Sequence, residues 1–291
     1  MKKATESTAV ARRFDPRLPS LGFWVAFLSA GIGIGGGTIL VSMLHSVFGF
    51  DFKKAARMSL ATIIPISLVG SISHFITYSG ELPLNYYVVF IPACMFGAIV
   101  GGKILGKRQN RWLTSAFGIF LLLVGLRMLK LFDFPSLIYS ELDGTFFQQC
   151  LVIIPTGMSF GLIGASLGIG CGLLIVPFFV MVIGLNMHQA ITLSLANMFF
   201  LTLSTTCISN RHALKTMEAN SLTSLLIPAL VGAIIGAVIS SYLPADVLKI
   251  VFGSFLMVMA CYIVIRETAV HQKVRTWLGN TDGVSAEDLS A

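Results

Sequence analysis

Long apolar segments fill most of this chain and restrict what it can fold into. A helix needs about 20 consecutive apolar residues to cross the hydrocarbon core of a bilayer. The segments show no alternation of apolar and polar residues, so helices are favoured over the strands of a β-barrel. The candidate segments are 20–49, 56–79, 84–106, 111–131, 145–166, 172–184, 188–209, 219–242 and 245–265. The sequence therefore predicts an all-α polytopic membrane protein.

The charge content supports this prediction and limits the partners. Only 11% of the 291 residues are charged and the mean hydropathy is +0.86, whereas soluble domains carry about 25% charged residues. The net charge of +7 could suit nucleic acid, but Lys and Arg lie in short loops and tails, where they orient a membrane protein. We expect a lipid bilayer as partner, no nucleic acid, no metal and no cofactor. We also expect no enzymatic activity.

Two glycine clusters interrupt the apolar segments. They read "GIGIGGGTIL" from Gly31 to Leu40 and "SLGIGCGLLI" from Ser166 to Ile175. Each glycine costs a helix about 1 kcal/mol relative to alanine, and breaks at membrane depth are tolerated only where the freed backbone faces protein or water. Unpaired N–H groups at the start of the second half-helix favour an anion. The predicted donors of a substrate site are Gly35, Gly36, Gly37, Thr38, Gly170, Cys171 and Gly172.

Glycines also permit close helix packing, and this second explanation competes with the first. The pairs Gly97/Gly101 and Gly232/Gly236 have the GxxxG spacing of packed membrane helices. We assign these four glycines to packing. For the denser glycine clusters we favour the anion site.

The second half of the chain repeats the first at an offset of 135 residues, which pairs Gly33 with Gly168 and Ser59 with Ser194. Each repeat holds one glycine-broken helical unit and three transmembrane helices. The predicted organisation is an N-terminal tail 1–19, repeat one 20–131, a linker 132–144, repeat two 145–266 and a C-terminal tail 267–291.

The orientation depends on how the broken units cross the membrane. If each unit enters and leaves on one side, each repeat has three crossings, so the two repeats are inverted. Lys and Arg then concentrate on the cytoplasmic side, as membrane insertion requires. If each unit spans the membrane, this charge bias is weak. We expect a multi-pass protein of the cell (inner) membrane with both termini cytoplasmic. The sequence is compatible with both arrangements of the broken units, re-entrant and membrane-spanning.

Polar side chains follow each glycine cluster at equivalent positions. Ser59 and Thr62 share a helix face, as do Ser194 and Asn197, and a buried amide needs hydrogen-bond partners. These four residues are candidate lining residues of the site. His74 is expected to be a solvated histidine at a helix end rather than a proton relay. No acidic residue lies in mid-membrane, so a carboxylate relay is not expected.

The motifs "GIGGGTILVSML" with "AARMSLAT" and "GIGCGLLIVPFF" with "AITLSLAN" resemble the TauE/SafE (sulfite exporter) family of membrane permeases. The resemblance implies transport of a small sulfur-containing anion, such as sulfite, sulfoacetate, another sulfonate or thiosulfate. It also implies a substrate site at the glycine clusters with Ser59, Ser194 and Asn197. The chain departs from the pattern at Ser42, where the second repeat has Pro177, and at Cys171, where the first repeat has Gly36.

Two other functions remain open at this point. An anion channel would use the same donors as a carrier. A membrane thiol or electron carrier would need paired cysteines, but no cysteine of one repeat has a cysteine at the equivalent position of the other. The sequence does not specify the transport direction, the coupling ion or whether the chain forms a homo-oligomer.

Overall fold

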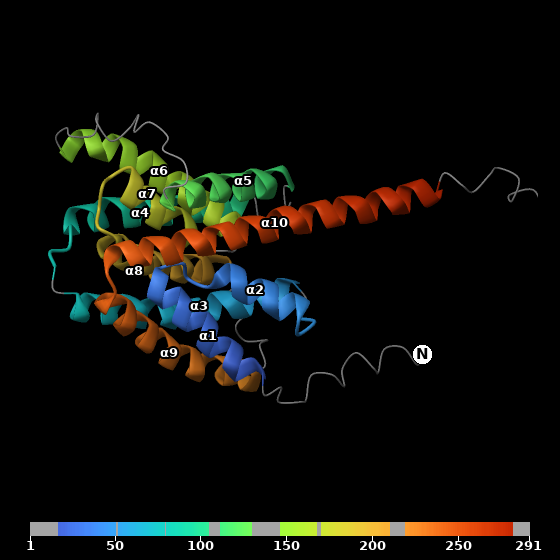
Figure 1. Cartoon of the computed structure of the whole chain (residues 1–291), viewed down its shortest axis with the longest axis horizontal. Helices are drawn as coiled ribbons and strands as arrows, with labels where there is room; N and C mark the ends of the chain where they lie inside the picture. The colour runs from blue at the N-terminus through green and yellow to red at the C-terminus, as the bar shows by residue number, and fades with distance from the viewer. Residues whose placement is uncertain are drawn as a thin grey trace, which may run out of the picture. The chain divides into compact units, whose positions relative to one another are not determined.

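Every element that the computed structural model describes is an α-helix. It describes residues 17–50, 52–78, 80–104, 111–129, 146–167, 170–209 and 219–281. The helices are α1 (Arg17–Ile32), α2 (Gly37–Ser46), α3 (Phe52–Thr77), α4 (Leu84–Ile104), α5 (Arg111–Met128), α6 (Phe146–Leu167), α7 (Gly172–Met181), α8 (Met187–Ser209), α9 (Ala219–Tyr242) and α10 (Ala245–Thr281) (Figure 1). The all-α prediction is confirmed. The linker 132–144 lies outside the described residues, and α10 continues beyond the predicted end of repeat two.

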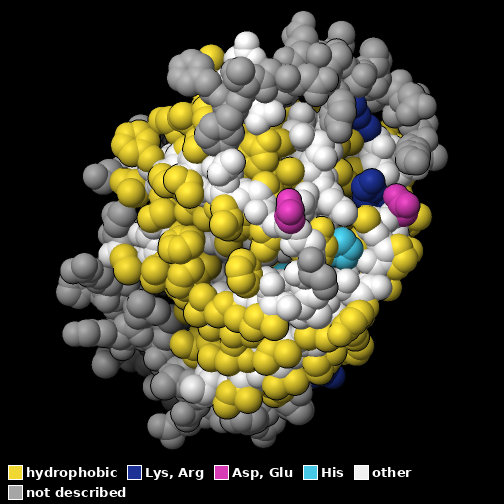
Figure 2. Space-filling model, turned by 90° about the vertical axis from the view of Figure 1, so that its left-hand side faces the viewer, with side chains coloured by type: hydrophobic (Ala, Val, Ile, Leu, Met, Phe, Trp, Pro, Cys, Tyr) yellow, Lys and Arg dark blue, Asp and Glu magenta, His cyan; other side chains and the backbone are white. Residues whose placement is uncertain are grey.

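Six of the described helices are long and apolar enough to cross a membrane: α3, α4, α6, α8, α9 and α10. Their outward side chains are apolar: Ile76 is 77% exposed and Val88 is 73% exposed. On the face drawn in Figure 2, hydrophobic side chains cover most of the surface that described atoms form. Such a surface is stable in lipid and unfavourable in water, so the prediction of a polytopic membrane protein is confirmed.

The chain divides into two compact units. The first holds α1–α4, α6–α9 and the first residues of α10, and the second holds α5 and the rest of α10. Within the second unit, Gly125 and Gly253 allow close approach, since a Cβ on Gly125 would lie 3.3 Å from the Gly253 carbonyl oxygen. All the candidate site residues belong to the first unit.

In the first unit, the helix contacts of one repeat recur in the other. Helix α1 packs on α9 as α6 packs on α4, and α3 packs on α9 as α8 packs on α4 (Figure 1). The short helices α2 and α7 pack on α3 and α8, and α3 and α8 contact each other. Exchanging the equivalent helices of the two repeats therefore leaves this set of contacts unchanged. The inverted orientation of the repeats stays a prediction.

Glycines form the closest of these contacts. Gly232 and Gly236 lie against the backbone of α1, and Gly97 and Gly101 lie against that of α6. A Cβ on Gly101 would lie only 2.7 Å from the Leu162 carbonyl oxygen, so a larger residue would separate the helices. The assignment of both GxxxG pairs to helix packing is confirmed.

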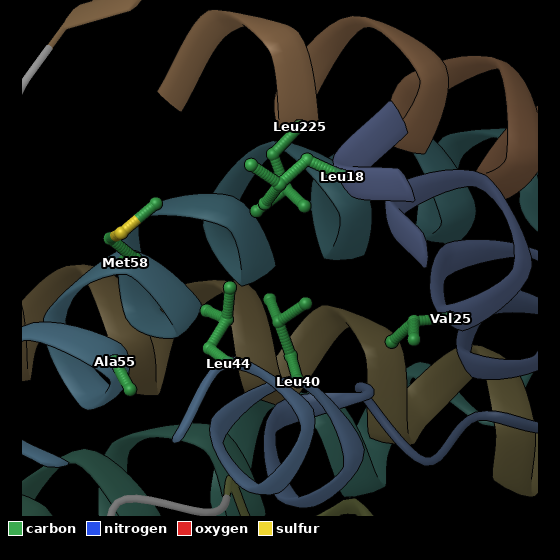
Figure 3. Packing of buried hydrophobic residues seen from close by; sticks show 7 residues of the cluster. All are labelled: Leu18, Val25, Leu40, Leu44, Ala55, Met58 and Leu225. Atoms are coloured by element: carbon green, nitrogen blue, oxygen red, sulfur yellow. The ribbon is translucent and has the colours of Figure 1, made fainter. Parts of the chain in front are cut away.

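The helix that follows the first break folds back along the helix that precedes it. Leu40 and Leu44 of α2 belong to the same buried cluster as Leu18 and Val25 of α1 (Figure 3). Ala55, Met58 and Leu225 complete this cluster. The second broken unit behaves alike, because the Phe178 ring of α7 lies 5.6 Å from the Phe160 ring of α6. Each glycine cluster is thus the tip of a helical hairpin, which is the shape that a re-entrant unit requires.

Candidate functional site

Both helix breaks fall at the glycine clusters, as the sequence predicts. The first break separates Ile32 from Gly37, and its residues Gly33, Gly35 and Gly36 have φ angles of 74°, 80° and 59°. The second separates Leu167 from Gly172 and contains Gly170 with φ 75°. Residues with a Cβ rarely adopt positive φ. The glycines are therefore required for the turn at the tip of each hairpin.

The two breaks touch each other. A Cβ added to Gly172 would lie 2.6 Å from the carbonyl oxygens of Gly33 and Ile34, well inside van der Waals contact. The Ser194 hydroxyl of α8 donates a 2.7 Å hydrogen bond to the Gly33 carbonyl. The start of α7 therefore lies directly against the end of α1, and α8 holds the contact from the side.

The start of α2 carries unpaired main-chain donors, as the first turn of every α-helix does, together with two unpaired hydroxyls. The first main-chain bond of this helix runs from Leu40 N–H to the Gly36 carbonyl over 2.9 Å. The N–H groups of Gly37, Thr38 and Ile39 have no main-chain acceptor in the described part of the chain. The hydroxyls of Ser29 and Thr38 are also buried without a partner. Unpaired buried donors are costly, and here they gather where the helix dipole is positive.

The start of α7 follows the second helix break, in which residues 168–169 lie outside the described range. The N–H groups of Leu174 and Ile175 both bond to the Cys171 carbonyl, over 2.9 and 3.0 Å. This leaves Gly172 and Leu173 without a main-chain acceptor among described residues, a range that omits 168–169. The predicted donors Gly170, Cys171 and Gly172 are all buried. The acceptors that Gly172 and Leu173 would ordinarily use are the carbonyls of residues 168 and 169, which lie outside the described residues.

Two of the predicted hydroxyl residues, Ser59 and Ser194, donate to carbonyls at the first break, so their hydroxyls are not free donors. Ser59 donates to the Gly37 carbonyl over 3.4 Å, and Ser194 binds the Gly33 carbonyl. Thr62 donates to the Met58 carbonyl of its own helix over 2.8 Å, and no contact brings its hydroxyl to a break. Ser59 and Ser194 therefore fix the carbonyl side of the first break, while the N–H groups remain available.

Met198 lies against both helix breaks, and the sequence did not indicate it as a candidate residue. Its thioether occupies the space that a Cβ on Gly35 would need, and its methyl group does the same for Gly170. The side chain is fully buried and lies next to the two glycine clusters at once. Its equivalent in the first repeat, Ile63, is an ordinary core residue, so no pattern in the sequence distinguished Met198.

Asn197 belongs to a small polar cluster that includes two thiols. Its Nδ2 donates to the Cys94 sulfur over 3.4 Å, while its Oδ1 is buried without a partner. The Cys94 thiol also interacts with that of Cys171, whose Sγ donates to the Phe160 carbonyl over 2.8 Å. The comparison of equivalent positions missed Cys94, because the two contacting cysteines occupy non-equivalent positions. The amide therefore has a partner for Nδ2 but none for Oδ1. Cys94 and Cys171 connect it to the start of α7.

His74 is buried, and the prediction of a solvated histidine was wrong. Its Nε2 lies 3.1 Å from the Ala30 carbonyl oxygen of α1 and 3.0 Å from the Ser240 hydroxyl of α9. The side chain has no exposed area. Its place near the end of α3 suggested solvent, but α1 and α9 cover that end of the helix.

Acidic residues are absent from the described helices that form the candidate site, and basic residues lie only near helix ends. Neither Asp nor Glu occurs in α1–α4 or α6–α9, and Lys and Arg occur only near the ends of α1, α3 and α4. Helix dipoles, N–H groups, hydroxyls and an amide are the means of binding that these helices supply. Such neutral donors suit a small anion that must also be released.

The fold and the broken helices define a polytopic helical membrane protein with its candidate site between two half-helices. The family model described as "Sulfite exporter TauE/SafE" matches residues 2–128 and 153–284. The chain belongs to this family, which consists of membrane transporters rather than enzymes. The resemblance that the motifs indicated is therefore confirmed.

Curated relatives cover parts of the chain. It is 33% identical over 110 residues to "Probable membrane transporter protein YunE" of Bacillus subtilis, which is 38% of this chain and 40% of that protein. A probable membrane transporter protein of Methanocaldococcus jannaschii is 26% identical over 57% of this chain and 61% of its own length. "Sulfite exporter TauE/SafE family protein 5" of Arabidopsis thaliana is 30% identical over 34% of this chain and 22% of its own length. The matches thus cover less than two thirds of each relative, and no solved structure matches the chain.

Proposed function

We propose that the chain is a secondary transporter for a small sulfur-containing anion, such as sulfite, sulfoacetate, another sulfonate or thiosulfate. The anion binds between the two repeats at the starts of α2 and α7. The observation that carries the proposal is the contact between the two helix breaks, the first of which lies next to the unpaired hydroxyls of Ser29 and Thr38. A charged ligand at such a position satisfies donors that otherwise remain unpaired.

The residues divide into two roles in this proposal. Gly35, Gly36, Gly37, Thr38, Gly170, Cys171 and Gly172 supply or aim the N–H groups. Asn197 contributes its amide, which is half satisfied in this conformation. Ser59 and Ser194 brace the first break through its carbonyls, and Thr62 supports its own helix.

The arrangement in the membrane forms part of the same proposal. Two inverted repeats with re-entrant hairpins bring both glycine clusters to the middle of the bilayer, where such transporters bind substrate. Both termini then lie in the cytoplasm, and the protein resides in the cell (inner) membrane. The fold-back of α2 and α7 on α1 and α6 supports this arrangement.

A binding and flux screen tests the function. Purified protein would be titrated with sulfite, sulfoacetate, taurine, thiosulfate, sulfate and carboxylate analogues, and the ligands that bind would be followed into proteoliposomes. We expect saturable uptake that is accelerated by unlabelled substrate on the opposite side. A channel shows no such counterflow, and binding of carboxylates alone would refute the substrate class.

An anion channel remains a second candidate that uses the same donors. A thiol or electron carrier is a third, and the contact between Cys94 and Cys171 is the observation in its favour. Replacing both cysteines by serine separates it from a transporter. A thiol carrier would lose all activity, whereas an anion transporter would retain saturable flux.

A further inference from the structure

His74 of α3 contacts the end of α1, just before the first glycine cluster. The main-chain N–H of Ile34 would ordinarily bond to the Ala30 carbonyl, four residues earlier in the helix. Here the N–H groups of Gly33 and Ile34 both bond to the Ser29 carbonyl, over 2.9 and 3.1 Å. The Ala30 carbonyl oxygen instead lies 3.1 Å from Nε2 of His74. A titratable side chain thus replaces a main-chain donor at the end of α1, the helix that leads into the candidate site.

The hydrogen bonds fix the tautomer of this imidazole. A carbonyl oxygen can only accept, so the proton lies on Nε2 and is donated to Ala30. The Ser240 hydroxyl, 3.0 Å from Nε2, has its own acceptor in the Ala237 carbonyl at 3.0 Å. The Nδ1 atom of His74 is therefore the basic nitrogen, and it is buried without a hydrogen-bond partner. It is an available position for one proton.

A second buried histidine lies nearby. His188, at the start of α8, is 7% exposed and its Nδ1 is also without a partner. Its ring stacks on Tyr78 with centroids 5.3 Å apart, and it interacts electrostatically with His74. The two rings are like-charged when protonated, so at most one of them can readily carry a proton.

The described helices that pack against α3 provide no carboxylate to balance a positive charge on His74. The described titratable groups on the helices packed against α3 are Arg17 of α1, His45 of α2, His188 and Cys207 of α8, and Tyr242 of α9. Tyr78 and Glu81 follow α3, and Lys54 lies near its start. None of the packed helices contains an acidic residue. An imidazolium buried here without a counter-ion is unfavourable.

We propose that His74 is the protonation site that couples proton binding to anion binding in this transporter. The inference rests on the proposed function. When an anion enters between the helix breaks, its charge balances an imidazolium, and Nδ1 takes up one proton from solvent. The charged ring also strengthens the Nε2–H bond to the Ala30 carbonyl. By linkage, the proton raises the affinity for the anion as much as the anion raises the affinity for the proton.

The test measures proton uptake during anion binding to the full-length protein. Calorimetric titrations with thiosulfate and sulfoacetate would be run near neutral pH in two buffers of different ionisation enthalpy. Both probes remain fully ionised there, so any linked proton binds to the protein. We expect close to one proton per anion, and an affinity that rises by up to about tenfold per pH unit as pH falls.

Variants then assign the proton to its residue. His74→Gln keeps an N–H donor for the Ala30 carbonyl but cannot take up a proton, so we expect anion binding without linked protons. Flux in proteoliposomes should also lose its response to a pH gradient. The control, His188→Gln, should keep the linkage. The proposal is overturned if His74→Gln retains the proton count, or if His188→Gln abolishes it and His74→Gln does not.

The outcomes separate this inference from the proposed function. If neither probe nor any other sulfur-containing anion binds the unaltered protein, the proposed function fails. If an anion binds without proton uptake, the proposed function stands and the role of His74 is refuted. The proton count of the unaltered protein can refute the role of His74 even if His74→Gln does not fold.

Discussion

Two glycines with similar positive φ angles allow the anion-site geometry to be tested against a control. Gly36, which caps the start of α2, has φ 59°, and Gly49 has φ 66°. Alanine in the left-handed region costs about 1–2 kcal/mol at either position. A Cβ on Gly49 meets nothing within 4 Å, whereas one on Gly36 lies 2.9 Å from Val25 Cγ1 and 3.2 Å from Ser29 Cβ. Only the Gly36 variant therefore also forces α1 and α2 apart.

The expected effects follow from this difference. Gly49→Ala should lower the free energy of unfolding by about 1–2 kcal/mol and leave anion affinity unchanged. Gly36→Ala adds an overpacking cost of about 1–3 kcal/mol, because Val25 or the helix must move. The same movement misaligns the N–H groups of Gly37 and Thr38. We expect anion affinity to fall by about tenfold or more, since each lost charge-assisted hydrogen bond is worth about 1.5–3 kcal/mol.

Two measurements on each variant decide the question. Unfolding in detergent micelles gives the stability difference, and titration with sulfite or thiosulfate gives the affinity. If Gly36→Ala merely melts earlier and binds the anion as well as Gly49→Ala does, the first glycine cluster is a packing device. The anion site would then have to lie elsewhere in the first unit.

Three further predictions address other parts of the molecule. Asn197→Ala should change stability little, because the buried amide is only half satisfied, and should weaken anion binding by about 1–3 kcal/mol in the same titration. Met198→Ala should destabilise the protein by about 2–5 kcal/mol and widen the site. In flux assays, the transport rate of larger sulfonates should therefore rise relative to that of sulfite. An unchanged substrate preference would place Met198 outside the site. A single cysteine at Lys53, in a cysteine-free background, should resist labelling from outside the cell, and ready labelling would exclude the re-entrant arrangement.

The helix breaks could be predicted from sequence because backbone sterics and the absence of water in a bilayer leave few alternatives. A run such as Gly35-Gly36-Gly37 cannot continue an apolar helix at low cost, and a break at membrane depth must face protein or water. The offset between repeats then located the second break at Gly170. These rules act on the chain locally, so they need no knowledge of how distant segments pack.

The contacts that complete the site could not be predicted in the same way. The repeat alignment pairs equivalent positions, but Cys94 meets Cys171 and Met198 meets both glycine clusters, and these are contacts between non-equivalent positions. His74 was misjudged for a related reason. Its distance from the end of α3 is a property of one helix, whereas its burial depends on α1 and α9.

In the proposed site, the two helix breaks have chemically different surroundings. The first break is surrounded by oxygen and nitrogen donors, with the Ser29 and Thr38 hydroxyls close by and His74 behind it. The second is bordered by the thiols of Cys171 and Cys94 and by the Asn197 amide. Hydroxyls and N–H groups bind oxyanions well, whereas thiols are weak donors on a soft, polarizable atom. An anion held between them has different surroundings at its two ends, so the symmetry of the helix contacts does not impose a symmetric ligand.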